Sequence, residues 1–229
     1  MEDILCNSIK VLNFVNTPVP SNTFLLVRED RHCVVIDPGT REQVDVRDFI
    51  QSNGLTLDYI ILTHEHFDHC WGVNYLLESF PAKVVATRLC TKWVQTPMNY
   101  FNQLYYNSDE MYQIKKVDVI VEEVGWKLMW DEIPIVFVNT PGHTSKGMCV
   151  EIGGCLFTGD TLLYRTRPFI KKRYGGSLSE LKQSIENIYY SYSGDTKVFP
   201  GHGDPFLLKE TKDFYYKYFN DKKDEMSDR

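Results

Sequence analysis

The sequence predicts an α+β fold in which two layers of β-sheet pack together and helices flank them. Short apolar segments separated by turn signals indicate strands in both halves of the chain, and helical spacing returns between them. This order fits a sheet sandwich better than a doubly wound parallel sheet. With 229 residues, 43% of them hydrophobic, the chain has ample apolar content for a buried core.

The first part of the chain predicts a β-meander. Its apolar segments are short, and the last of them ends at Asp37-Pro38-Gly39, a turn signal. The expected strands span residues 4–14, 23–28 and 33–36.

Helices and strands alternate after the meander. Asn53-Gly54 has the form of a helix C-terminal cap, and a fully apolar segment, Tyr59 to Leu62, runs straight into His64. A polar motif therefore begins where a strand ends. The expected elements are helices at residues 44–51 and 72–80 and strands at residues 59–62 and 83–86.

An aromatic-rich insertion is expected at about residues 90–116, with Thr96-Pro97 as a helix start. Three interpretations stay open for it: a wall of a substrate pocket, a contact in a homodimer, or a satellite core under a long loop. Its aromatic residues include Trp93, Tyr100, Phe101, Tyr105, Tyr106 and Tyr112.

The second half is also mostly strands, with two helices near its end. Leu181, Ile185 and Ile188 have helical spacing, and Ser177 with Glu180 forms a capping signal before them. We expect residues 1–220 to form one domain and the charged tail, residues 221–229, to be disordered. The expected strands span residues 117–121, 126–129, 133–138, 148–152, 155–158 and 197–199, and a last helix spans about 207–219.

The composition argues against two classes of function. A net charge of −6 and a pI near 5.5 disfavour a protein that neutralises phosphate backbones, so no nucleic-acid partner is expected. Met1-Glu2-Asp3 places acids where a secretory leader needs cations, and no apolar run is long enough to cross a bilayer. We therefore expect a soluble, cytoplasmic protein with no membrane partner.

The cysteines are expected to be reduced. They are scattered without a C-x-x-C pair, and without an export signal an even count is poor evidence for disulfides. Cys33, Cys149 and Cys155 lie in strand-like surroundings, where a thiol is usually a small buried hydrophobe. The six are Cys6, Cys33, Cys70, Cys90, Cys149 and Cys155.

The residues that carry chemistry are concentrated in one short run. Three of the six histidines fall with Asp68 inside His64-Glu65-His66-Phe67-Asp68-His69, a spacing that suits two metal ions better than one. His143 and His202 each follow an apolar strand at a Pro-Gly turn, and Asp160 also follows a strand. His32 is assigned no role, and Asp37 is expected to pin its turn.

The ordered set H-x-H-x-D-H, P-G-H-T, F-T-G-D-T and P-G-H-G resembles the metallo-β-lactamase-fold superfamily, in particular its glyoxalase II-like branch, over roughly residues 20–205. The resemblance implies an αβ/βα four-layer sandwich, in which helices flank two mixed β-sheets and the metals lie at one edge. It implies a first metal held by His64, His66 and His143, a second held by Asp68, His69 and His202, and Asp160 as the bridge.

Zinc is the first choice of metal, although iron and manganese accept the same donors. Two divalent ions about 3.5 to 4 Å apart would lower the pKa of a bridging water towards about 7, and Asp68 is expected to orient the resulting hydroxide. Thr63, Thr144 and Thr161 are placed to orient imidazole rings. No dedicated acid is evident, because His32 alone lies outside the motifs, and a thiolate leaves without prior protonation whereas an amine must gain a proton. We therefore expect a small thioester or ester as substrate.

A basic loop after Asp160 is expected either to receive an anionic part of that substrate or to be simply solvated. Lys172 is its best candidate, because the stretch with Arg173 and Tyr174 is similar to the one in which glyoxalase II enzymes place a glutathione-contacting lysine. Glyoxalase II also has a helical C-terminal domain, whereas one short helix and a tail follow His202 here, so glutathione itself is not implied. The loop's basic residues are Arg165, Arg167, Lys171, Lys172 and Arg173.

Three other functions stay open. A persulfide dioxygenase resembles this branch but uses one iron held by two histidines and an aspartate, and His202 argues against it. A phosphodiesterase or nuclease of the same superfamily is disfavoured by the acidic charge. A non-catalytic binding module is disfavoured because the set of ligands is intact.

Overall fold

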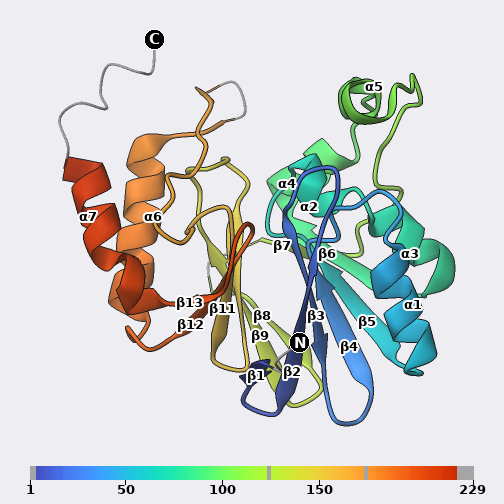
Figure 1. The fold of residues 1–229 in the computed structure, drawn as a ribbon, viewed down its shortest axis with the longest axis horizontal. Helices are drawn as coiled ribbons and strands as arrows, with labels where there is room; N and C mark the ends of the chain where they lie inside the picture. Colours follow the sequence, from blue (N-terminus) through green and yellow to red (C-terminus); the bar gives the residue numbers. More distant parts are fainter. Residues whose placement is uncertain (1–3, 123–124, 173–174, 221–229) are drawn as a thin grey trace.

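Two mixed β-sheets pack face to face, and helices cover both outer faces (Figure 1). The computed structural model describes residues 4–122, 125–172 and 175–220. The α+β prediction of a four-layer sandwich is confirmed. The predicted disorder of residues 221–229 lies outside the described residues.

The first sheet has seven strands in chain order, antiparallel from β1 to β4 and parallel from β4 to β7. The expected strand at residues 4–14 is a hairpin of two strands. The strands are β1 (Ile4–Cys6), β2 (Ile9–Val15), β3 (Asn22–Val27), β4 (His32–Ile36), β5 (Thr56–Ile61), β6 (Lys83–Thr87) and β7 (Val119–Val121).

The second sheet has six strands in the order β13-β12-β11-β10-β9-β8. All neighbours are antiparallel except β11 and β12, which are parallel because α6 (Leu178–Ser191) connects them. The strands are β8 (Lys127–Trp130), β9 (Ile133–Asn139), β10 (Met148–Ile152), β11 (Cys155–Gly159), β12 (Lys197–Pro200) and β13 (Phe206–Leu207).

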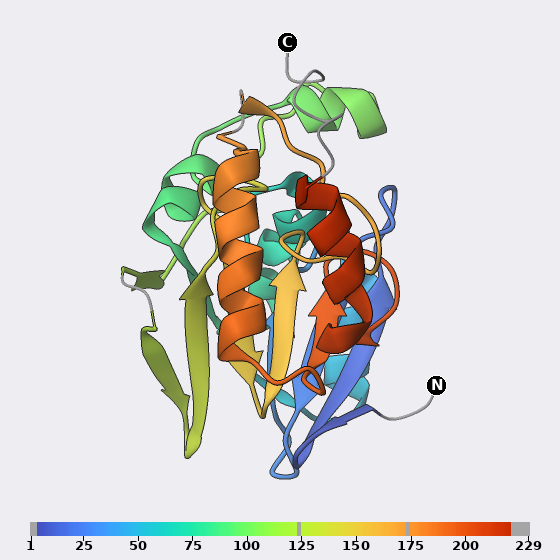
Figure 2. The same cartoon turned by 90° about the vertical axis from the view of Figure 1, so that its left-hand side faces the viewer.

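The helices cover the sheets through apolar faces with helical spacing. Leu181, Ile185 and Ile188 of α6 are buried against the six-stranded sheet, and the side chain of Ser177 caps the helix by accepting a hydrogen bond from the amide of Glu180, as predicted. Figure 2 shows α6 and α7 side by side over this sheet. The other helices are α1 (Val44–Ser52), α2 (Phe67–Cys70), α3 (Val73–Ser79), α4 (Arg88–Val94), α5 (Tyr100–Tyr106), η2 (Leu208–Thr211) and α7 (Lys212–Asn220).

One prediction about a helix position is wrong. Thr96-Pro97 does not start a helix, since α5 begins three residues later, after Asn99. The sequence interpretation also missed α4, whose N-terminus is capped by the Thr87 side chain. Among the described residues, no helix combines the length and apolar character needed to cross a bilayer.

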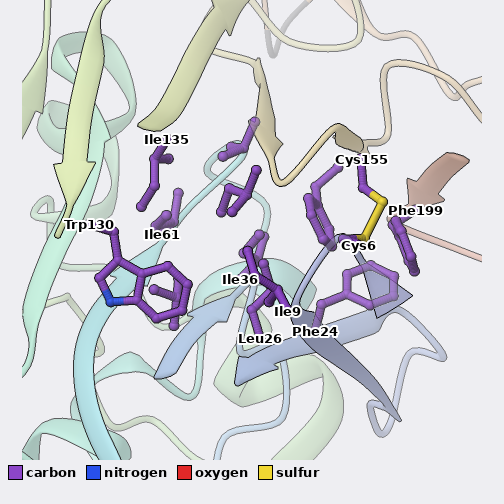
Figure 3. Close-up of a cluster of buried hydrophobic side chains, with 14 of the residues drawn as sticks. Cys6, Ile9, Phe24, Leu26, Ile36, Ile61, Trp130, Ile135, Cys155 and Phe199 are labelled. Atoms are coloured by element: carbon purple, nitrogen blue, oxygen red, sulfur yellow. A yellow bond between two sulfur atoms is a disulfide. The ribbon is translucent and has the colours of Figure 1, made fainter. Parts of the chain in front are cut away.

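The central core lies between the two sheets, where side chains of both inner faces interdigitate (Figure 3). The ring of Phe24 from the first sheet meets the rings of Phe157 and Phe199 from the second edge-on, with centroids 5.4 and 5.3 Å apart. Burying an aromatic or branched aliphatic side chain of this size contributes about 1.5 to 3 kcal/mol. This packing sets the spacing of the two sheets.

A disulfide between Cys6 and Cys155 also joins the sheets (Figure 3). The prediction that all six cysteines are reduced is therefore wrong for these two, because β1 pairs with β2 and so lies against β11, 149 residues away in sequence. The other four cysteines are free and buried.

Candidate metal centre

All of the predicted ligands follow strands that end at one edge of the sandwich. Strands β9, β11 and β12 run in the same direction, so their carboxyl ends meet there, next to the carboxyl end of β5. After β9, β11 and β12 the chain passes a Gly or Pro-Gly position directly before the polar side chain. The seven residues are His64, His66, Asp68 and His69 after β5, His143 after β9, Asp160 after β11 and His202 after β12.

The structure brings four of these side chains into a first group, His64, His66, His143 and Asp160, each with one donor atom within 4.8 Å of the others. Nε2 of His143 lies 3.0 Å from Nδ1 of His66 and 3.5 Å from Oδ2 of Asp160. Histidines from one sheet and a histidine from the other thus face a common point.

A second group contains Asp68, His69 and His202. Oδ2 of Asp68 lies 3.6 Å from Nε2 of His69 and 3.4 Å from Nε2 of His202. Asp160 lies between the groups, since its Oδ2 is 3.5 Å from Nε2 of His143 in the first group and its Oδ1 is 3.5 Å from Nε2 of His69 in the second. Its two oxygens therefore reach both groups, as expected of a bridge.

The donor set fits metal ions. Nε2 of His64, Nε2 of His69 and Oδ1 of Asp160 are buried and make no hydrogen bond to any described residue. Buried polar atoms are normally paired, and leaving one unpaired costs about 1 to 3 kcal/mol. Two ligands at about 2.1 Å from a tetrahedral ion are about 3.4 Å apart, close to the separations of 3.4 to 3.6 Å at Asp68.

The opposite nitrogen of the histidines is held by hydrogen-bonding partners that orient the rings. Nδ1 of His143 lies 2.6 Å from the carbonyl oxygen of Phe169, and Nδ1 of His202 lies 3.1 Å from that of Pro20. A carbonyl only accepts, so Nδ1 carries the proton and Nε2 is left free for a metal. Sequence reasoning missed both, because a backbone carbonyl has no residue signature.

Asp37 does more than pin a turn. One of its carboxylate oxygens accepts a hydrogen bond from the amide of Thr63 at 2.7 Å, and the other meets the Thr63 hydroxyl and Nδ1 of His69 at 2.5 and 3.0 Å. The signal that could have found it is its place at the end of β4, the parallel neighbour of β5.

The three threonines differ in their contacts. The Thr63 hydroxyl lies 3.0 Å from Nδ1 of His64 and can orient that ring. The Thr144 hydroxyl instead donates to Glu65, and that of Thr161 meets Thr140. Only the first prediction of a ring contact matches a hydrogen bond in the structure.

Gly201 lets two strands approach closely behind the ligands. A Cβ atom at this position would lie 2.2 Å from Oδ1 of Asp160 and 2.8 Å from Cε1 of His69. Real Cβ contacts are never so short, so the glycine of the P-G-H-G motif is required by packing.

Burial and neighbouring charges separate the histidines into two kinds. Burial lowers the pKa of His64 well below its usual range and, helped by His143, lowers that of His66 to about 3. Burial also opposes protonation of His69 and His202, but the carboxylates of Asp68 and Asp160 raise their pKa values to about 9 and about 10. The carboxylates thus create a strongly negative point that attracts protons or metal cations.

The basic loop makes contact with the centre through its backbone. The Phe169 carbonyl that holds His143 belongs to it. Nε of Arg165 donates to the carbonyl oxygen of Glu210 at 3.2 Å and the guanidinium of Arg167 lies over the ring of Tyr218, so both are directed towards the C-terminal helices. Lys172 is among the described residues, whereas Arg173 and Tyr174 lie outside them.

The aromatic insertion packs directly against the ligand turn. The ring of Phe67, between two predicted ligands, stacks on those of Phe101 and Tyr105, with centroids 4.1 and 5.0 Å apart. An apolar cavity of about 30 Å³ lies behind Phe67, and Glu65, Trp93 and Phe101 are among its lining residues. The insertion therefore forms a wall next to the ligand turn.

His32 lies elsewhere, as expected. Its Nδ1 meets the carboxylate of Asp58 at 2.9 Å, which the indole N–H of Trp130 also contacts at 2.7 Å. Asp37 follows the last residue of β4, five residue steps after His32, a span of about 16 Å.

Comparisons with known proteins identify the family of this chain. A family model described as the metallo-beta-lactamase superfamily matches residues 16–202. The chain is 32% identical over 182 residues to a hydroxyacylglutathione hydrolase of Aeromonas hydrophila. This alignment covers 79% of this chain and 61% of the relative. It is 30% identical over 178 residues to BaeB of Bacillus velezensis, a probable polyketide biosynthesis zinc-dependent hydrolase, covering 76% and 69%. The chain thus spans about three fifths of the hydroxyacylglutathione hydrolase.

Solved structures share the architecture. The BLEG-1 B3 metallo-beta-lactamase superposes with a TM-score of 0.77 at 23% identity, covering 89% of this chain and 96% of the other. ETHE1 from Myxococcus xanthus superposes with a TM-score of 0.71 at 25% identity, covering 90% and 82%.

Proposed function

Because this chain belongs to the metallo-beta-lactamase superfamily, we propose that it is a binuclear metal-dependent hydrolase that cleaves a small thioester or ester, similar to glyoxalase II. One observation carries the proposal: two groups of donor atoms converge, and the two oxygens of Asp160 reach both, Oδ2 towards His143 and Oδ1 towards His69. A single metal would leave the second group without a purpose.

We assign the ligands by these groups. The first ion would be held by His64, His66 and His143, and the second by Asp68, His69 and His202, with Asp160 shared. Nitrogen and oxygen donors suit zinc first and also accept iron or manganese. The zinc-dependent relative BaeB supports zinc.

When bound, two divalent cations supply a water nucleophile at neutral pH and stabilise the negative charge that develops on a carbonyl oxygen. The carboxylate of Asp68 would accept a hydrogen bond from that water and orient it. The carbonyl oxygens of Phe169 and Pro20 accept hydrogen bonds from Nδ1 of His143 and His202, so Nε2 is the nitrogen that each ring presents to a metal.

The leaving group follows from the histidine inventory. Five of the six histidines belong to the cluster, and His32 is about 16 Å from Asp37 along β4, so no histidine remains to protonate an amine. A thiol has a pKa of about 8.5 and leaves as the thiolate without an acid. This favours a thioester or activated ester over an amide or lactam.

The residues around the two groups of donor atoms suggest what acyl group and what thiol carrier the substrate has. The aromatic wall of Phe67, Phe101 and Tyr105 suits an apolar acyl group, and the lysines of the loop anchored at His143 suit an anionic thiol carrier. The hydroxyacylglutathione hydrolases support a thioester, but because the chain spans only part of their length, glutathione is not specified.

The test is to purify the protein without added metal, measure metal identity and equivalents, and assay a panel of acyl thioesters. Two equivalents and thioester hydrolysis that His69→Ala abolishes are expected, while His32→Ala, a histidine outside the cluster, retains activity. Fewer than two equivalents together with an active His69→Ala variant would refute the proposal. One iron with oxygen consumption on a persulfide would establish the dioxygenase instead.

A further inference from the structure

The ligand turn contains a buried carboxylate that belongs to neither group of donor atoms. Glu65 lies between His64 and His66, and its side chain is only 2% exposed. A charged carboxylate in this environment is costly unless it is paired and hydrogen-bonded. Its partners therefore indicate why the sequence places a glutamate here.

Both oxygens of Glu65 are satisfied by the loop that carries His143. Oε1 lies 3.0 Å from Nζ of Lys146, and Oε2 accepts a hydrogen bond of 3.0 Å from the hydroxyl of Thr144. The Lys146 side chain is 13% exposed, and its ammonium also lies 4.9 Å from the centre of the Trp93 ring. The ion pair is thus enclosed rather than solvated.

This pairing joins the two sheets at the centre itself. Glu65 follows β5 of the seven-stranded sheet, whereas Thr144 and Lys146 lie in the loop between β9 and β10 of the six-stranded sheet. His66 and His143 also come from different sheets, since His66 follows β5 and His143 follows β9. Their donor nitrogens are 3.0 Å apart. A backbone hydrogen bond from Met148 to Thr63 joins the same two segments, but Glu65 supplies the charged side-chain contact between the two histidine-bearing loops.

We propose that Glu65 and Lys146 form a buried clamp, helped by Thr144, that positions His66 against His143 and so builds the first metal site. The two residues are positioning residues and bind no metal themselves. The inference rests on the proposed function, because it concerns one of its two metal sites. It predicts that breaking the clamp weakens the first site and spares the second.

The experiment titrates zinc and, separately, cobalt into the metal-free protein and into Glu65→Gln and Lys146→Met. Loss of an outer partner of a metal ligand typically costs 10- to 100-fold in affinity. We expect a loss of about this size for one of the two equivalents, with the other unchanged, and a change in the cobalt absorption spectrum. Far-UV circular dichroism and the melting temperature of the metal-free variants establish that they fold.

The matched controls are Glu78→Gln and Lys115→Met, the same substitutions in an exposed pair whose charged atoms are 4.0 Å apart. They should leave both equivalents unchanged. The double variant of Glu65 and Lys146 should lose less than the sum of the single losses, since it leaves no unpaired buried charge.

The outcomes separate the clamp from the proposed function. A wild-type protein that binds fewer than two metals contradicts the proposed function. A wild-type protein that binds two, with Glu65→Gln keeping both at full affinity, overturns only the clamp. Equal weakening of both sites also overturns it, because a general loss of structure would then explain the effect.

Discussion

Nδ1 of the buried His69 lies 3.0 Å from Oδ2 of Asp37, 32 residues earlier in the chain. The contact fixes the ring so that Nε2 faces the second group of donors. Asp37 has a φ of 53°, a left-handed conformation that asparagine also tolerates, so Asp37→Asn removes the charge without straining the backbone. We expect about 10- to 100-fold weaker binding of one metal equivalent, measured by chelator competition. Unchanged affinity would mean that Asp37 acts on the turn alone.

Metal binding should release protons. The pKa values of His69 and His202, about 9 and about 10, exceed neutral pH, so both rings are protonated in the metal-free protein at pH 7. A coordinating nitrogen must be unprotonated, so binding releases about two protons and apparent affinity rises with pH until about 9 to 10. Burial already keeps His64 and His66 neutral.

Calorimetry in two buffers of different ionisation enthalpy measures these protons. In His202→Ala, the number of protons released on metal binding should fall to about one. An apparent enthalpy that is the same in both buffers would contradict the assignment of the two protonated rings.

Gly201→Ala should disrupt the bridge. The new Cβ would lie 2.2 Å from Oδ1 of Asp160, so the carboxylate must move. A displacement of about 1 Å at a reacting centre can cost about 100-fold in rate, and we expect a loss of at least that size in kcat/KM. Gly203→Ala is the control, because its Cβ would meet nothing within 4 Å, although its φ of 80° makes the substitution strain the backbone, which Gly201→Ala does not. Equal losses in the two variants would contradict the clash as the cause.

The disulfide should stabilise the sandwich. Cys6→Ser removes a link across 149 residues, and we expect the free energy of unfolding to fall by about 2 to 5 kcal/mol. Denaturant unfolding with and without reductant measures this contribution. Reductant should lower the free energy of unfolding of the wild-type protein and leave that of the variant unchanged. Labelling of the unfolded wild-type protein should detect four free thiols, and six would show that the bond does not form.

The aromatic wall should select the acyl group. Phe101→Ala removes the ring that stacks on Phe67, and we expect about a 10-fold fall in kcat/KM for a butanoyl thioester relative to an acetyl one, with metal content unchanged. Leu104→Ala on the same helix is the control, because that side chain is 56% exposed and is not among the residues lining the cavity. If both thioesters are affected equally, the insertion is a satellite core.

Local sequence signals predicted most elements but not all of their limits. Ser177 and Glu180 located the start of α6, because a capping box acts within four residues. Thr96-Pro97 carried a comparable signal and failed, since Pro97 lies before the segment in which Met98 pairs with Tyr112. A tertiary contact thus prevailed over a local preference.

The sequence by itself determined the strands, the turn that holds four donors and the three later motifs, because these depend on residues close together in the chain. Only the tertiary structure decided which donors face one another, that Asp37 holds His69, that Glu65 meets Lys146 and that Cys6 meets Cys155. The physical reason is that each of these contacts joins segments brought together by the packing of two sheets, and no local periodicity records it.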